Sequence, residues 1–114
     1  FCNGVLARYG VETTYFDPLI GAGINGLFKP NTRAVLVEAP GSQSFEMPDI
    51  PAIAAVAHAQ GVLVIDDNTW ATPLYHRSLE QGVDISIQAD GARIERDHEQ
   101  DRRHEQDDIA AAAG

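Results

Sequence analysis

Residues 49–67, DIPAIAAVAHAQGVLVIDD, decide the fold that we expect for this chain. Their first part repeats apolar residues at helical spacing, after Asp49 as the N-cap and before Gly61 as the residue just past the helix end. The run Val62–Ile65 then follows, almost without a polar residue, which is typical of a strand covered by helices on both faces. The stretch therefore predicts a helix over Asp49–Gln60 that leads into a central strand.

Further strand and helix patterns lie on both sides of this unit. Short runs rich in β-branched residues predict strands at Val11–Phe16, Thr32–Glu38 and Val83–Ile87. The segment Pro18–Phe28 is amphipathic with helical period, but its three glycines weaken it as a helix. Strands that alternate with helical segments are typical of βαβ units, so we expect an α/β fold with a parallel sheet and flanking helices.

The expected chemistry lies where the strands end. Successive parallel strands place their carboxyl ends at one edge of the sheet, so Glu38–Ser42 and Asp66–Thr72 should face one crevice. Side chains alternate along a strand, and Asp66 and Asp67 should therefore point to opposite sides. From spacing alone, these carboxylates fit a strand end capped by Asx turns somewhat better than a functional site, which needs further support.

Composition excludes several classes of partner. The net charge of −9 disfavours nucleic acid and anionic lipid surfaces, which bind Lys and Arg. No apolar run approaches the ~18 residues of a membrane span. The single cysteine, Cys2, cannot form an internal disulfide, and no secretory signal follows Phe1, so we expect a cytoplasmic protein of one domain. Because the patterned sequence begins at once, we also expect that the chain starts inside a longer protein.

Residues 90–114 differ from the rest of the chain. They hold 8 acidic residues and 4 arginines, repeat the sequence HEQD at 98–101 and 104–107, and end in an alanine run. Dense charge with almost nothing apolar favours a disordered or marginally helical tail, with a boundary at Ala89. Metal binding through His98 and His104 is a weaker alternative, because the zinc-protease spacing of two histidines is absent and we expect no metal site.

Five segments, in order and at matching spacing, carry a resemblance to a known family. They are FCNGVL at 1–6, GVETT at 10–14, EAPGS at 38–42, DNTWATP at 67–73 and VDISIQA at 83–89. Together they make residues 1–89 similar to the cystathionine β-lyases of the Cys/Met-metabolism family of pyridoxal-phosphate (PLP) enzymes. The resemblance implies a partial PLP-dependent transferase large domain of the aspartate aminotransferase type.

The resemblance also implies a cofactor site. Asp67 matches the aspartate that pairs with the pyridine nitrogen of PLP; a carboxylate there keeps the ring protonated, so that it can accept electrons. Ser42 lies in the Pro-Gly-Ser pattern of the β-lyase branch, close to the cofactor, and Thr69 is expected to support Asp67. Trp70 either assists Asp67 or packs in the core. The implied substrate is a small amino-acid thioether, cleaved in methionine biosynthesis, and the implied assembly of the whole enzyme is a homotetramer.

The lysine that such enzymes use as a Schiff base is expected directly after Ala89, where this chain continues with Asp90-Gly91-Ala92-Arg93 instead. Lys29 is the only lysine, and its place between a helix and a strand indicates an ordinary surface charge. We therefore expect no catalytic residue in these 114 residues and an inactive chain.

Two alternatives remain open at this point. The chain fits a relative that acts on the γ carbon of its substrate, because such relatives share most of the motifs. It also fits a small noncatalytic α/β binding module. Gly21, Gly23 and Gly26 have the Gly-x-Gly-x-x-Gly spacing of a dinucleotide loop, although four residues separate them from the preceding predicted strand.

Overall fold

A three-stranded parallel sheet forms the centre of the protein. The computed structural model describes residues 1–89. Strands β1 (Ala34–Glu38), β2 (Leu63–Asp67) and β3 (Ile85–Ile87) lie in the order β1-β2-β3, so β2 is central, as predicted. The register pairs Glu38 with Asp67, and Asp67 with Ile87. All three strands therefore end at the same edge, which confirms the expected α/β architecture.

Helix α1 (Ile50–Ala59) has the boundaries that the sequence predicts. The side chain of Asp49 accepts a hydrogen bond from the amide of Ala52 at 3.1 Å, which caps the first turn. Past the other end, Gly61 takes the left-handed conformation, with φ at +68°. The helix then connects directly to β2, so the αβ unit forms as expected.

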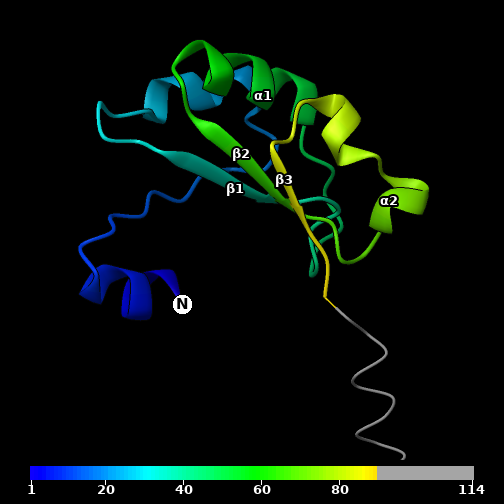
Figure 1. Cartoon of the computed structure of the whole chain (residues 1–114), viewed down its shortest axis with the longest axis horizontal. Helices are drawn as coiled ribbons and strands as arrows, with labels where there is room; N and C mark the ends of the chain where they lie inside the picture. The colour runs from blue at the N-terminus through cyan, green and yellow to red at the C-terminus, as the bar shows by residue number, and fades with distance from the viewer. Residues whose placement is uncertain (90–114) are drawn as a thin grey trace, which may run out of the picture.

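The core lies on one side of the sheet. Helix α1 and the 3₁₀ helix η2 (Gly21–Leu27) cover this face, as the upper layer in Figure 1 shows. The buried apolar residues are Ile24, Val35, Val37, Ala39, Ile50, Ile53, Ala54, Ala57, Val62, Val64 and Val83. Alternation along the strands explains this set, because every second residue of β1 and β2 points to α1.

The opposite face of the sheet is open within residues 1–89, contrary to the prediction of helices on both faces. Leu36, Leu63, Ile85 and Ile87 lie on that face, and each is about half exposed, between 45% and 58%. Within the described residues, only the N-terminal part of the chain runs on this side (Figure 1). The apolar run of β2 thus reflects two apolar faces, of which one is covered here.

The segment Val11–Phe16 is not a strand, so that prediction is wrong. It is extended, but it forms no ladder with β1, β2 or β3. Its side chains alternate in direction, so that Phe16 packs against the core while Tyr15 is 68% exposed. Before it, a π-helical turn, η1 (Cys2–Leu6), begins the chain. An extended segment becomes a strand only with a hydrogen-bonded partner, which sequence pattern alone does not supply.

Two short helices connect β2 to β3. They are α2 (Thr72–Tyr75) and the 3₁₀ helix η3 (Ser78–Gln81), which Gly82 ends with φ at +99°. The described residues contain no helix of the length and apolarity that a membrane span requires. The predicted tail and its His98 and His104 lie outside the described residues.

Candidate functional site at the carboxyl edge of the sheet

The two loops that the sequence places at one edge do meet there. Glu38 and Asp67 are register partners at the ends of β1 and β2, so their side chains leave the sheet on the same face. The hydroxyl of Ser42 donates a hydrogen bond to Oε2 of Glu38 at 3.0 Å. Ser42, Glu38 and Asp67 therefore lie along one edge, with Glu38 in the middle.

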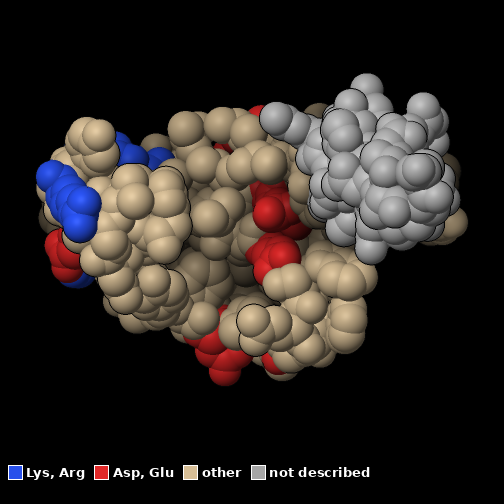
Figure 2. Space-filling view, turned by 90° about the horizontal axis from the view of Figure 1, so that it is seen from below, with Lys and Arg blue, Asp and Glu red and all other residues tan. Residues whose placement is uncertain are grey.

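A shallow hollow of about 320 Å³ adjoins this edge at the end of β1. Its lining combines carboxylates, hydroxyls and a glycine: Pro18, Glu38, Gly41, Ser42, Gln43, Ser44 and Glu46. In Figure 2, acidic side chains gather in the middle of the face seen from below, and Lys and Arg lie at one end of the molecule. The hollow is thus a polar and acidic surface beside the strand ends.

Asp67 is half-buried and held by its own loop. Its Oδ1 accepts hydrogen bonds from the amide of Thr69 at 3.1 Å and from the hydroxyl of Thr69 at 2.6 Å. The hydroxyl of Thr69 in turn accepts from the amide of Ala89 at 2.9 Å. Within residues 1–89, no group donates to Oδ2 of Asp67. One carboxylate oxygen is therefore held by Thr69, and the other has no protein donor within residues 1–89.

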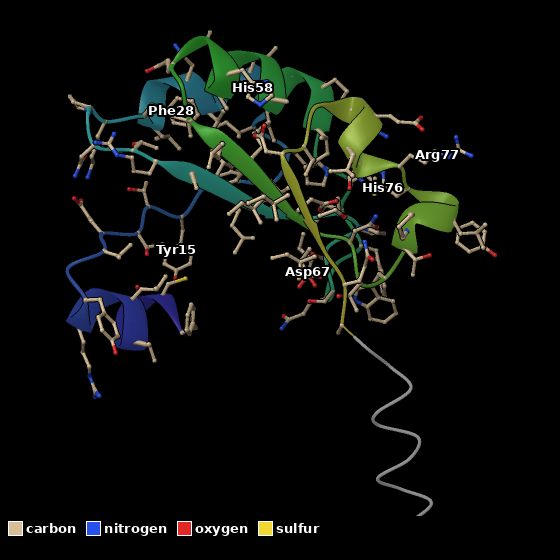
Figure 3. All side chains as sticks on the ribbon, viewed as in Figure 1. Tyr15, Phe28, His58, Asp67, His76 and Arg77 are labelled. Carbon is tan, nitrogen blue, oxygen red and sulfur yellow. The ribbon has the colours of Figure 1, made fainter. Side chains whose placement is uncertain are left out.

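Asp66 points to the other side of β2, as strand alternation requires. It is completely buried against the core, and burial raises the pKa of its carboxyl group. The hydroxyl of Ser78, His76 and the backbone amide of Ala39 partly oppose this shift. The two neighbouring aspartates thus occupy different environments, because Asp66 is completely buried, whereas Asp67 is half-buried at the end of β2 (Figure 3).

The sequence analysis missed His76. Its Nε2 lies 3.5 Å from Oδ2 of Asp66, and its side chain is only 6% exposed. It follows Tyr75 in a segment with no helical or strand period, so no sequence signal predicted its burial. It becomes visible as a partner of Asp66 only in three dimensions.

Trp70 does not pack in the core. It is 56% exposed and meets Phe45 edge to face, with ring centroids 5.5 Å apart. Phe45 comes from the loop after β1 and Trp70 from the loop after β2, so the contact joins the two loops beside the site.

Two other predicted features lie away from this edge or lack their expected context. Lys29 forms an ion pair with Glu12 on the surface, and both side chains are about half exposed or more. The glycines of 21–26 lie in η2, and the segment before them is not a strand. A dinucleotide loop requires a strand directly before its glycines, so the described structure lacks that arrangement.

The residues present fit a cationic, hydrogen-bonding ring. Asp67 offers a carboxylate oxygen without a protein donor in the described chain, and Glu38 adds a second negative charge on the same face. Two carboxylates favour the protonated form of a neighbouring ring nitrogen. Pyridoxal phosphate contains such a nitrogen.

Known proteins resemble this chain in sequence and in fold. A protein of Rhizobium johnstonii, named as a candidate cystathionine β-lyase, is 62% identical over 89 residues, covering 78% of this chain and 22% of that protein. Cystathionine β-lyase MetC of Escherichia coli is 44% identical over 91 residues, covering 78% and 23%. The crystal structure of cystathionine γ-lyase from Lactobacillus plantarum, complexed with L-serine, superposes with a TM-score of 0.71 at 36% identity, covering 74% and 22%.

The chain therefore spans less than a quarter of the length of these relatives. The structural likeness places its sheet in the large domain of a PLP-dependent enzyme, as the sequence implied. The sequence profile of the Cys/Met metabolism PLP-dependent enzymes matches residues 1–94, and the chain belongs to this family.

Proposed function

We propose that this chain forms the pyridine-binding edge of a PLP-dependent carbon–sulfur lyase of the cystathionine β-lyase type, with Asp67 as the partner of the pyridine nitrogen. The observation that carries the proposal is the asymmetric bonding of the Asp67 carboxylate. Thr69 donates two hydrogen bonds to Oδ1 of Asp67, while Oδ2 of Asp67 has no donor within residues 1–89. A ring N–H is the donor that this arrangement lacks.

In the proposed role, Asp67 remains ionised and accepts one hydrogen bond from the ring. Pyridoxal phosphate, when bound, supplies a protonated ring that accepts the electron pair left as the substrate loses its Cα proton. The contribution of Asp67 is to keep that proton on the ring nitrogen, since an adjacent carboxylate favours the charged form. The two hydrogen bonds from Thr69 stabilise the ionised carboxylate and fix its direction.

Ser42 has a secondary part in this proposal. Its hydroxyl donates to Glu38, and Glu38 lies beside Asp67 in the register. The bond therefore holds the loop after β1 close to the strand end, where we propose that it borders the cofactor. Trp70 and Phe45 brace the same loop against the loop that carries Asp67.

The proposed substrate is an amino-acid thioether, cleaved at its β carbon–sulfur bond in the cytoplasm by a homotetramer that serves methionine biosynthesis. Support for this class comes from the resemblance of the motifs and from the named relatives. Cleavage at the γ carbon is the second candidate, because a γ-lyase shares the fold at 36% identity. We also propose that these 114 residues alone do not carry out the reaction, since Lys29 is ion-paired on the surface and is the only lysine.

The test uses a chimera in which residues 1–89 replace the matching segment of the E. coli relative. We expect the chimera to take up PLP, seen as absorbance above 400 nm, and to release pyruvate from cystathionine. Asp67→Asn should abolish both, whereas the exposed Glu80→Gln is the matched control and should change neither. A folded chimera that takes up no PLP would refute the proposal. Release of a four-carbon α-keto acid by γ-elimination, in place of pyruvate, would favour the second candidate.

A further inference from the structure

A buried polar pair lies behind Asp67, on the face of β2 that packs toward α1. Asp66 is 0% exposed and His76 is 6% exposed, and Nε2 of His76 lies 3.5 Å from Oδ2 of Asp66. Within residues 1–89, neither carboxylate oxygen of Asp66 nor Nε2 of His76 has a hydrogen-bond partner. A buried charge without a partner costs several kcal/mol. Burial therefore disfavours the charge of Asp66, and His76 is the titratable side chain that faces it.

Within residues 1–89, the surroundings of Asp66 offer no cation besides His76. Helix α1 covers the region with apolar side chains, and the hydroxyl of Ser78 donates to that of Ser86 at 3.1 Å. The charged groups that act on Asp66 are His76, which favours its ionised form, and Asp67, which opposes it. A second carboxylate one residue away makes the uptake of a proton by the pair more favourable.

Gln81 contacts the other side of the imidazole. Its side-chain amide lies 3.4 Å from Nδ1 of His76, and which of the two groups donates depends on the tautomer of the ring. Nε2 of His76 is therefore the ring nitrogen that faces the carboxylate of Asp66.

The backbone of His76 holds a second point of the same loop. The side-chain amide of Asn68, itself fully buried, donates to the carbonyl oxygen of His76 at 2.7 Å. The backbone amide of Asn68 donates to the carbonyl oxygen of Ile87 at 2.8 Å. Asp66 and Asn68 flank Asp67 in the sequence, and His76 contacts both.

We propose that His76 is a positioning residue for Asp67 and clamps the two residues that flank Asp67 in the sequence. The side chain of His76 shares a proton with buried Asp66, and the carbonyl oxygen of His76 accepts the hydrogen bond from Asn68. The shared proton comes from solvent and resides on Oδ2 of Asp66 or on the imidazole, so the pair is neutral. With both neighbours fixed, Asp67 is kept pointing to the edge of the sheet. The purpose of the clamp rests on the proposed function, but its existence does not.

The clamp should depend on pH. Burial raises the pKa of Asp66, so the folded chain binds the proton more tightly than the unfolded chain does. The stabilisation is then complete below the ordinary carboxyl pKa of 3.8 and is lost as the pH rises through the raised value. Above that value, the pair carries a buried negative charge next to Asp67, and the loop should loosen.

The test measures amide hydrogen exchange of Thr69 by NMR in the full chain, because this amide bonds Asp67 directly. His76→Phe keeps the bulk but has no donor, and Thr69 should exchange about tenfold faster. His76→Gln keeps an N–H and should restore exchange to within about threefold of the wild type. The exposed Glu80→Gln on η3 is the matched control and should have no effect.

Three results would overturn the proposal. The first is equal exchange in the Phe and Gln variants, and the second is unchanged pH dependence of Thr69 exchange in Asp66→Asn. The third, which needs no variant, is a ¹⁵N spectrum that shows Nδ1 of His76 without a proton, because a pair that shares a proton between Oδ2 and Nε2 keeps the other ring proton on Nδ1. PLP uptake by the Asp67→Asn chimera tests the proposed function separately, because that substitution leaves His76, Asp66 and Asn68 in place.

Discussion

Substitution of Gly82 by alanine should destabilise the chain more than the same substitution at Gly61, although both glycines have a left-handed backbone. Gly82 ends η3 with φ at +99°, and a Cβ atom there would lie 2.8 Å from Cβ of Ala54 in α1. Real Cβ atoms do not approach each other so closely, so α1 or η3 must move. The left-handed backbone costs about 1–2 kcal/mol for a residue with a side chain. Overpacking against the core adds about 1–3 kcal/mol.

Gly61 provides the matched control, because it has φ at +68° but no atom within 4 Å of a built Cβ. We expect Gly61→Ala to lower the free energy of unfolding by about 1–2 kcal/mol and Gly82→Ala by about 2–5 kcal/mol. Urea denaturation followed by circular dichroism measures both. Equal losses in the two variants would show that the contact between η3 and α1 is not as close as the structure has it. The loop that carries His76 would then be less firmly placed.

Three further changes test separate parts of the structure. Asp84→Asn removes the negative charge that faces the Val64 amide, 2.7 Å away, and His58, 3.0 Å away. These two groups lower the pKa of Asp84, so their stabilisation is present above 3.8 and lost as the pH falls. Urea midpoints should therefore separate from the wild type at neutral pH and converge in strong acid, and a constant gap would contradict this. Thr69→Val in the chimera should weaken PLP binding about tenfold, while Thr69→Ser should not, as a spectrophotometric titration would show. Asp49→Ala should lower the free energy of unfolding by about 1 kcal/mol through loss of the N-cap of α1, and Asp49→Asn, which still accepts from Ala52, should restore most of it.

The fold was predictable where local signals and burial agree. The N-cap Asp49 and the left-handed Gly61 bound α1, and the apolar run before Asp66 marks the central strand. The failure at Val11–Phe16 has a physical cause, since strand formation depends on a partner that a single segment does not reveal. The coverage of the sheet was also beyond sequence pattern. An apolar run predicts two apolar faces but not which of them residues 1–89 cover.

The candidate site was predictable to the extent that parallel strands end at one edge. Asp67, Thr69 and Ser42 lie near that edge as the spacing required, whereas their roles remain the proposal above. His76 could not be predicted, because its burial depends on the path of the chain from α2 to η3. Trp70 was open between two roles, and its exposure excludes core packing within the described chain.

Two adjacent aspartates have acquired different chemistry through strand alternation alone. Asp66 points into the layer between β2 and α1, where desolvation favours a bound proton and His76 is the available partner. Asp67 points to the edge, where the amide and the hydroxyl of Thr69 donate to its Oδ1. In the proposed function, the carboxylate beside the cofactor ring is thus joined directly to one whose pKa is raised by burial in the core. Because the peptide bond between them joins the two positions, any change that ionises Asp66 should be felt first in the direction of the Asp67 side chain.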